Sequence, residues 1–226
     1  MRRDTLKTKE LIALTKKERA LLAVSRLAER YPDAVCSLVA SNAFQLLVAT
    51  RLSAQCTDAR VNLVTPALFE RFPTAELMAA AEAEDVEPYI RSCGLYKTKA
   101  RDLVAMARML CEKFGGQVPA TMEELTSLPG IGRKTANLIC GDVYGQAGTV
   151  VADTHCIRIT NRLGLTEGKD PYRVELQLRK LLPPEESNAF CHRLVLFGRD
   201  VCIARTPQCD ICPLGECCPS KNNIKK

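Results

Sequence analysis

No stretch of this 226-residue sequence is apolar enough to cross a membrane. A membrane-spanning helix needs about 20 consecutive apolar residues, and no apolar run here approaches that length. Residues 1–10 are rich in charge and lack the apolar core of a secretion signal. We therefore expect a cytoplasmic protein of bacterial type that has no membrane partner.

Signals for β-strands are also nearly absent. Apolar residues instead recur at three- and four-residue intervals, which is the spacing of one face of an α-helix. Ser41 or Asn42 precedes residues 43–52, which are apolar nearly all round and should form a buried helix. Thr57 should begin the next helix, which Pro66 should kink or end. The prediction is an all-α protein, of one domain or of two small ones.

Because the sequence lacks a secretion signal, its twelve cysteines are not expected to form disulfides. Eight of them are scattered, mostly in apolar helical segments where a free cysteine behaves as a small hydrophobic residue. This group comprises Cys36, Cys56, Cys93, Cys111, Cys140, Cys156, Cys191 and Cys217. Most of these side chains are therefore expected to serve only in packing.

The other four cysteines lie close together near the C-terminus. The pattern Cys202-x6-Cys209-x2-Cys212-x5-Cys218 occupies 17 residues, too few for a core of their own, so a metal centre would hold them together. Four thiolates suit either tetrahedral zinc or a cubane iron–sulfur cluster. Zinc modules usually have two Cys-x2–4-Cys pairs and this sequence has one, so the spacing favours a cluster with a structural role. Cys217, next to Cys218, leaves the fourth ligand open.

The formal net charge of +6 is concentrated at the two ends of the chain. Residues 1–30 carry +5 and residues 189–226 carry +3, which leaves −2 for the residues between them. Positive ends could attract a polyanion. On charge alone, however, an ordinary solubilising role is the simpler interpretation.

The most informative segment is Leu128-Pro129-Gly130-Ile131-Gly132-Arg133-Lys134-Thr135-Ala136-Asn137. Pro129 and Gly130 interrupt an apolar turn, and Gly132 opens a run with helical spacing, so the pattern predicts a helix, a tight hairpin and a second helix. The two glycines indicate a sharp turn with positive φ and a close approach by another group. Free N–H groups of the hairpin would lie at a helix N-terminus, which attracts anions. Lys134 falls in the first turn of this helix, and Asp153 follows 19 residues later.

Three motifs in one order carry a resemblance to a known family. They are the hairpin segment 128–137, the segment Val151-Ala152-Asp153-Thr154-His155 and the four-cysteine ending, and the segments 52–55 and 94–96 also match. Over roughly residues 20–220 the sequence resembles bacterial endonuclease III, of the helix-hairpin-helix superfamily. The resemblance implies a bifunctional DNA glycosylase and AP lyase of base excision repair. Such an enzyme releases oxidised pyrimidines from double-stranded DNA and nicks the strand 3′ to the abasic site by β-elimination.

The resemblance also implies an organisation. A six-helix domain of residues 36–147 would carry the hairpin, residues 1–35 and 148–226 would form an iron–sulfur domain, and DNA would bind in a cleft between the two. A [4Fe-4S] cluster would be held by Cys202, Cys209, Cys212 and Cys218. Residues 36–147 carry a net charge of −1 and the remainder +7, so the cluster domain would supply most of the attraction for phosphate. The enzyme would be a monomer associated with the nucleoid.

Catalytic roles follow from the same resemblance. The target nucleotide would be flipped out of the helix, and Lys134 would attack its C1′ to form a Schiff base. A lysine amine is nucleophilic only when neutral, and both a desolvated cleft and the positive end of a helix disfavour its charged form. The carboxylate of Asp153 would stabilise the cationic sugar and assist proton transfer. Taken singly, Lys134 could be a solvated helix lysine, and Asp153 could be the N-cap of the next helix.

The resemblance assigns DNA contacts as well. Gln55 and Leu95 would fill the space left by the flipped nucleotide and wedge the opposite strand. The remaining DNA-contact candidates are Gly130, Ile131, Gly132 and Arg133 at the hairpin, which could also bind a monovalent cation, and Arg205 in the cysteine segment.

Two other classes of protein are less consistent with these residues. The related adenine glycosylase has Ser in place of the lyase lysine, uses a Glu in the early helix and carries a further C-terminal domain, whereas this chain has Lys134 and no Glu in residues 52–58. A hairpin module that only binds DNA would need neither Lys134 nor Asp153.

Overall fold

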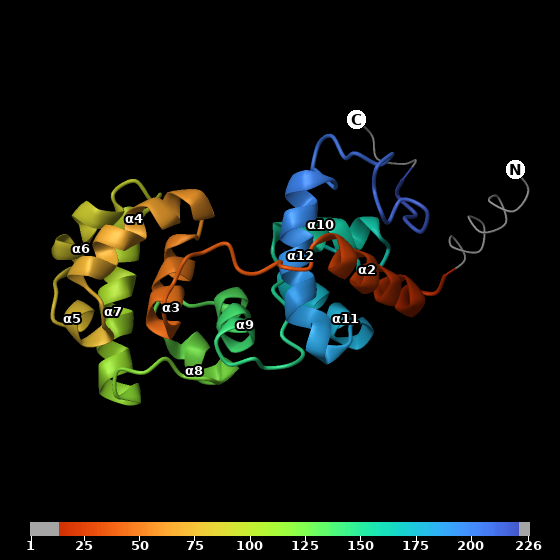
Figure 1. Ribbon diagram of the computed structural model, residues 1–226. Helices are drawn as coiled ribbons and strands as arrows, with labels where there is room; N and C mark the ends of the chain where they lie inside the picture. The colour runs from red at the N-terminus through yellow and green to blue at the C-terminus, as the bar shows by residue number, and fades with distance from the viewer. Residues whose placement is uncertain (1–13, 222–226) are drawn as a thin grey trace, which may run out of the picture. The chain divides into compact units, whose positions relative to one another are not determined.

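The computed structural model describes residues 14–221, and every regular element in that range is helical (Figure 1). The expected all-α class is therefore confirmed for the described residues. Within the same range no helix is both long enough and apolar enough to cross a membrane.

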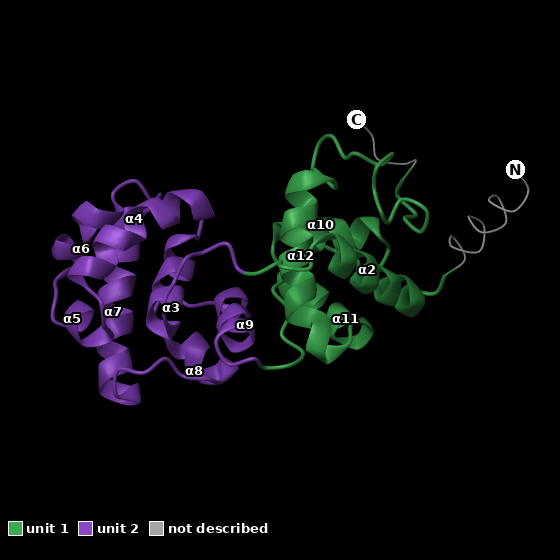
Figure 2. Ribbon diagram, viewed as in Figure 1, with its two compact units in different colours: residues 1–35, 146–226 green, residues 36–145 purple. Residues whose placement is uncertain are grey.

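The chain divides into two compact units (Figure 2). Unit 1 comprises residues 1–35 and 146–226, of which 14–35 and 146–221 are described, and unit 2 comprises residues 36–145. The boundary expected after residue 147 lies two residues beyond the observed one. Unit 1 contains α2 (Lys16–Arg30), α10 (Thr154–Arg162), α11 (Pro171–Leu181), η1 (Pro184–Glu186) and α12 (Ser187–Asp200). Unit 2 contains α3 (Ala43–Leu52), α4 (Asp58–Arg71), α5 (Ala75–Ala79), α6 (Ala83–Ile90), α7 (Tyr96–Phe114), α8 (Met122–Ser127) and α9 (Arg133–Asp142).

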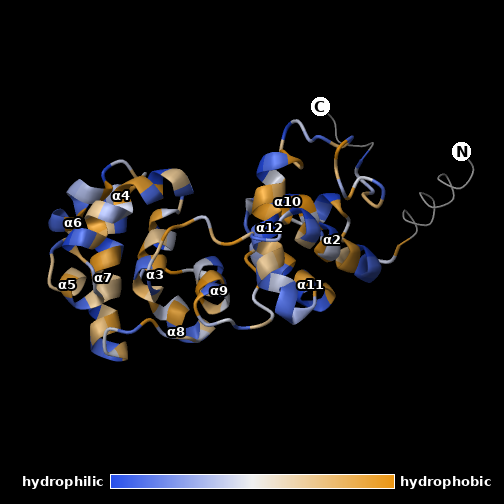
Figure 3. Ribbon diagram, viewed as in Figure 1, coloured by the Kyte–Doolittle hydropathy of each residue, from blue (hydrophilic) through white to orange (hydrophobic). Residues whose placement is uncertain are grey.

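Helix α3 lies at the centre of unit 2, where it contacts α4, α7 and α9. Its residues are almost all apolar, and the helix is buried on nearly every side. Asn42, rather than Ser41, is its N-cap, because the Asn42 side chain accepts a hydrogen bond from the Gln45 N–H at 2.9 Å. On the outer side of the unit, the amphipathic α7 packs against the short helices α5 and α6. In Figure 3 hydrophobic and hydrophilic residues alternate along α7 in the way that such a helix requires.

Pro66 was expected either to kink this helix or to end it, and helix α4 does not end there. It begins after the N-cap Thr57 and continues to Arg71. A proline inside a helix costs about 3 kcal/mol, because it removes one hydrogen bond and crowds the preceding turn. Helix α4 contacts both α3 and α6, and the burial of Val61 and Leu68 on either side of Pro66 offsets that cost.

Unit 1 is built around α12, which contacts α2, α10 and η1. Phe190, Leu194 and Phe197 of α12 are fully buried. Helix α11 packs on α2. This small helical core supports the two features of unit 1 that matter for function, the start of α10 and the loop that follows α12.

Candidate active site and metal centre

The hairpin joins α8 to α9 through Leu128–Gly132, as the sequence predicted. Gly130 has a φ of 73°, which only glycine adopts readily. A Cβ at this position would lie 2.9 Å from Arg51 Cδ and 2.9 Å from Asp102 Oδ2. Gly132 differs from expectation, because its φ is −100° and a Cβ would meet no atom within 4 Å. Its lack of a side chain therefore leaves open space at the start of α9.

An ion pair supports the hairpin from behind. Arg51, near the end of α3, donates from Nε to Asp102 Oδ2 of α7 at 3.0 Å, and its terminal nitrogen contacts the same oxygen. The two side chains are only 13% and 26% exposed. Neither residue was predicted from the sequence, although a lone charge in the otherwise apolar residues 43–52 could have suggested that Arg51 has a buried partner.

Ile131, one of the predicted DNA contacts, lies within the hairpin between α8 and α9. Its side chain is buried, and its N–H donates to the carbonyl oxygen of Leu128 at 3.1 Å. This N–H is therefore used within the hairpin. The first N–H groups of α9 have no acceptor inside their own helix, so an anion at this site would bind at Gly132 and the residues after it.

Lys134 lies in the first turn of α9 with its side chain exposed. Arg133 precedes it and is half-buried. The N-cap of α9 is Gly132, which supplies no side-chain hydrogen bond. The positive end of α9 is thus not neutralised by a capping carboxylate.

Asp153 is the N-cap of α10 in unit 1. Its Oδ1 accepts a hydrogen bond from the Cys156 N–H at 2.7 Å, and its own N–H donates to the Val151 carbonyl oxygen at 2.9 Å. The side chain is half-exposed. The capping role considered for this residue is therefore present, and it fixes the direction of the carboxylate.

Gln55 and Leu95 have the same unusual backbone conformation. In residues 14–221 they are the two non-glycine residues with positive φ, at 55° and 59°, and both are exposed. The turns that carry them are adjacent, because a Cβ on Gly94 would lie 3.5 Å from the Gln55 carbonyl oxygen. A strained backbone of this kind is typical of functional positions and costs about 1–3 kcal/mol per residue.

Lys99 lies beneath these turns and was not predicted as a site residue. It is fully buried, and its Nζ donates to the Leu52 carbonyl oxygen at 2.8 Å, at the end of α3. Burial lowers its pKa. Its position one helical turn before the buried Leu103 could have shown from the sequence that it faces the core.

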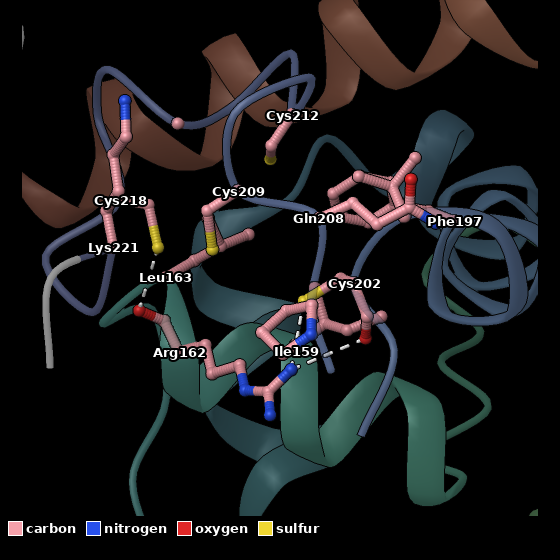
Figure 4. A pocket seen from close by; sticks show the side chains of 13 residues that line it. Ile159, Arg162, Leu163, Phe197, Cys202, Gln208, Cys209, Cys212, Cys218 and Lys221 are labelled. Carbon is pink, nitrogen blue, oxygen red and sulfur yellow. Dashed lines mark hydrogen bonds between the residues drawn. The ribbon is translucent and has the colours of Figure 1, made fainter. Parts of the chain in front are cut away.

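In unit 1, the four predicted ligand cysteines line one pocket (Figure 4). Cys202 follows α12, and Cys209, Cys212 and Cys218 come from the loop that extends to residue 221. Cys217 lies outside the pocket lining, is buried and donates to the Leu214 carbonyl oxygen at 3.4 Å. The placement of the side chains thus favours Cys218 over Cys217 as the fourth ligand.

A bound metal ion needs its ligand atoms at a short and nearly equal distance from one point. In residues 14–221 no three Cys, His, Asp or Glu side chains are grouped closely enough to hold one metal ion. A zinc ion requires all four sulfurs at about 2.3 Å from one point. The four thiols line one pocket, and four thiolates suit either a zinc ion or an iron–sulfur cluster. Burial raises the pKa of the Cys212 thiol to about 11, so a thiolate there needs a positively charged partner.

Two arginines of α10 hold the cysteine loop, and neither was predicted from the sequence. Arg162 donates to the Ile203 carbonyl oxygen at 2.9 Å, the Ala204 carbonyl oxygen at 2.6 Å and Cys202 Sγ at 3.4 Å. Arg158 donates to the Cys202 carbonyl oxygen at 3.1 Å. Arg205, the phosphate contact predicted for this loop, is exposed.

Comparison with known proteins gives consistent matches. Residues 48–184 match the family model described as HhH-GPD superfamily base excision DNA repair protein. The sequence is 46% identical over 206 residues to endonuclease III of Synechocystis sp., covering 91% of this chain and 94% of that protein. It is 42% identical over 196 residues to endonuclease III of Bacillus subtilis, covering 86% and 89%. A solved structure of a trapped endonuclease III–DNA covalent intermediate, an estranged-adenine complex, is 42% identical with a TM-score of 0.86, covering 92% and 97%.

Proposed function

Because the chain belongs to the endonuclease III family of base excision DNA repair proteins, and is therefore a DNA glycosylase and AP lyase, we propose that Lys134 is its nucleophile. The observation that carries the proposal is the exposed position of Lys134 in the first turn of α9, directly after the hairpin. The similar solved structure is that of a covalent DNA intermediate, which supports a reaction through a covalent bond.

The reaction begins with neutral Lys134. Its Nζ attacks C1′ of a flipped nucleotide, the bond from C1′ to the base breaks and the base leaves with the bonding electron pair. Opening of the sugar ring gives a Schiff base between Nζ and C1′. Loss of a proton from C2′ then expels the 3′ phosphate by β-elimination, which nicks the strand.

Asp153 supports the charge that develops on the sugar. Its Oδ1 is held by the Cys156 N–H, so the carboxylate is already oriented before DNA binds. A fixed negative charge stabilises a cationic sugar without reorganising during the reaction. The same carboxylate can accept and return protons at the sugar.

The other DNA contacts divide by type. Gly132 and Arg133 at the start of α9 are proposed to bind one phosphate, with Gly130 and Ile131 shaping the hairpin and a monovalent cation as a further ligand there. Arg205 adds a phosphate contact from its exposed loop. Gln55 and Leu95 occupy the space left by the flipped nucleotide, and their strained, exposed turns support this role.

A [4Fe-4S] cluster is proposed for unit 1, held by Cys202, Cys209, Cys212 and Cys218. The four thiols line one pocket and include a single Cys-x2-Cys pair, which supports a cluster rather than zinc. When bound, the cluster would supply a structural cross-link for a loop that has little core of its own. With residues 36–145 as the hairpin domain, unit 1 is then the iron–sulfur domain. We assign oxidised pyrimidines as substrates and the bacterial nucleoid as the place of action.

Borohydride trapping tests the role of Lys134. The protein is incubated with duplex DNA that contains one abasic site, and borohydride reduces any Schiff base to a stable cross-link. We expect cross-linking by the wild type and by Lys113→Gln, which changes an exposed lysine of α7 in the same unit, and none by Lys134→Gln. Cross-linking by Lys134→Gln at the wild-type level would assign the nucleophile to another amine.

A further inference from the structure

Cys56 and Cys93 form a pair of thiols in unit 2 that the proposed reaction does not use. Both are free, and their side chains lie close enough to interact electrostatically. Cys93 is fully buried, whereas Cys56 is partly exposed. A small oxidant can therefore reach the Cys56 thiol from solvent, whereas the Cys93 thiol is shielded from solvent by the protein.

The backbone brings these two cysteines together. Cys56 directly follows Gln55, and Cys93 directly precedes Gly94. The carbonyl oxygen of Gln55 is 3.5 Å from the position of a Cβ on Gly94, so the two turns are in van der Waals contact at the residues next to the cysteines. The turns are thus adjacent in their backbones as well as in their thiols.

The buried Lys99 acts electrostatically on this thiol pair. Its buried Nζ lies beneath the end of α3 and exerts a favourable electrostatic effect on the Cys93 thiolate. Burial nevertheless raises the pKa of Cys93 to about 11, so Cys93 is mostly a neutral thiol near pH 7. Because Cys56 is the more exposed of the two thiols, it meets an oxidant first and Cys93 reacts second.

We propose that Cys56 and Cys93 are a modification site, at which a hydroperoxide forms a reversible disulfide that links the turn of Gln55 to the turn of Leu95. Disulfides are not stable structural links in a reducing cytoplasm, but reversible ones form there under oxidant.

The reaction has two steps. The Cys56 thiolate attacks one peroxide oxygen, the O–O bond breaks, and Cys56 becomes a sulfenic acid while hydroxide leaves and takes a proton to become water. The Cys93 sulfur then attacks the Cys56 sulfur, the S–O bond breaks, and the proton of Cys93 leaves with the hydroxyl group as a second water. Overall, two thiols are oxidised by two electrons and one hydrogen peroxide is reduced to two waters.

The disulfide changes the two turns. Its sulfurs must approach to about 2.05 Å, closer than two unlinked thiols, so both turns shift toward each other. Gln55 and Leu95 are next to or near the linked residues and already have strained φ angles. On the basis of the proposed DNA contacts of these two residues, we infer that the oxidised form binds damaged DNA less tightly than the reduced form.

A second thiol pair in the same chain provides an internal comparison. Cys156 and Cys191 of unit 1 also lie close enough to interact electrostatically, but both are buried. Peroxide has no direct access to either thiol. The same exposure of the folded protein to peroxide should therefore oxidise Cys56 and Cys93 first and leave Cys156 and Cys191 reduced.

The experiment treats the folded full-length protein with hydrogen peroxide at pH 7.5 and maps disulfides by mass spectrometry of unreduced peptides. We expect a linked pair of peptides that contain Cys56 and Cys93, lighter by two hydrogen atoms than the separate peptides and separated by dithiothreitol. The Cys56→Ala variant should give no such link. The Cys111→Ala variant, which changes a partly exposed cysteine outside the pair, should give it at the wild-type level.

Binding of a duplex with a reduced abasic-site analogue measures the consequence. We expect about tenfold weaker binding after oxidation, recovered with dithiothreitol, and no change in Cys56→Ala. Peroxide damage to a metal centre would affect wild type and Cys56→Ala equally. The absence of the linked peptides overturns the modification site, and linked peptides with unchanged DNA affinity overturn its effect on binding. Both outcomes are independent of borohydride trapping, which tests the nucleophile alone.

Discussion

Replacement of Gly130 by alanine separates the structural role of the hairpin from its proposed role in DNA binding. The φ of 73° would cost an alanine about 1–2 kcal/mol. The new Cβ would also lie 2.9 Å from atoms of both Arg51 and Asp102, so their ion pair would have to move. The side chains of Arg51 and Asp102 are only 13% and 26% exposed, and displacing them adds about 1–2 kcal/mol to the cost of the substitution. We therefore expect Gly130→Ala to lower the free energy of unfolding by about 2–4 kcal/mol.

Gly132→Ala is the matched control in the same hairpin. Its φ of −100° suits any residue, and its Cβ would meet open space. Loss of a glycine N-cap costs less than about 1 kcal/mol. Because a phosphate is proposed to approach at this point, Gly132→Ala should instead weaken binding to abasic-site DNA by about tenfold, a difference of about 1.4 kcal/mol.

Urea unfolding followed by circular dichroism measures the first effect, and fluorescence anisotropy with labelled duplex DNA measures the second. In addition, the costs of Gly130→Ala and Arg51→Ala should not add, because the second substitution removes part of the clash. Equal loss of stability in the two glycine variants would refute the assignment of the ion pair as the reason for Gly130. Additive costs of Gly130→Ala and Arg51→Ala would do the same.

Two further predictions concern unit 1. Asp153→Asn should keep the N-cap and leave the free energy of unfolding within about 0.5 kcal/mol, while release of a damaged base in a single-turnover assay falls by about a hundredfold or more. The control Asp170→Asn, at the N-cap of α11, should leave base release unchanged. Normal base release by Asp153→Asn would show that Asp153 is only a capping residue. Cys218→Ser should lower the iron content and the visible absorbance of the purified protein, whereas Cys217→Ser should retain both, and the opposite result would make Cys217 the fourth ligand.

Local sequence signals were sufficient for the elements and for the positions of the main site candidates. The apolar residues 43–52 predicted a buried helix because no face of that segment could tolerate water. The break at Pro129 and Gly130 predicted the hairpin, and the position of Asp153 before a helix predicted its capping role. In each case the information lies within one or two helical turns.

The features that the sequence left unidentified depend on contacts between distant segments. The pairing of Arg51 with Asp102 joins residues 51 positions apart, and Lys99 reaches the end of α3 from another helix. For the same reason the sequence left two outcomes open at Pro66, a kink or an end of the helix, and packing on both sides of the proline lets α4 continue past it. The left-handed conformation of Gln55 likewise has no local signal, since glutamine rarely adopts it.

Helix α10 connects the two functional regions of unit 1. Asp153 caps its first turn, and Arg162, its last residue, holds the backbone of the cysteine loop. Nine residues of α-helix form a rod about 13.5 Å long that bends little. A disturbance that shifts the cysteine loop therefore acts on the far end of the rod that orients the carboxylate. On the proposed role of Asp153, damage to the loop can in this way slow base release without altering Asp153 itself.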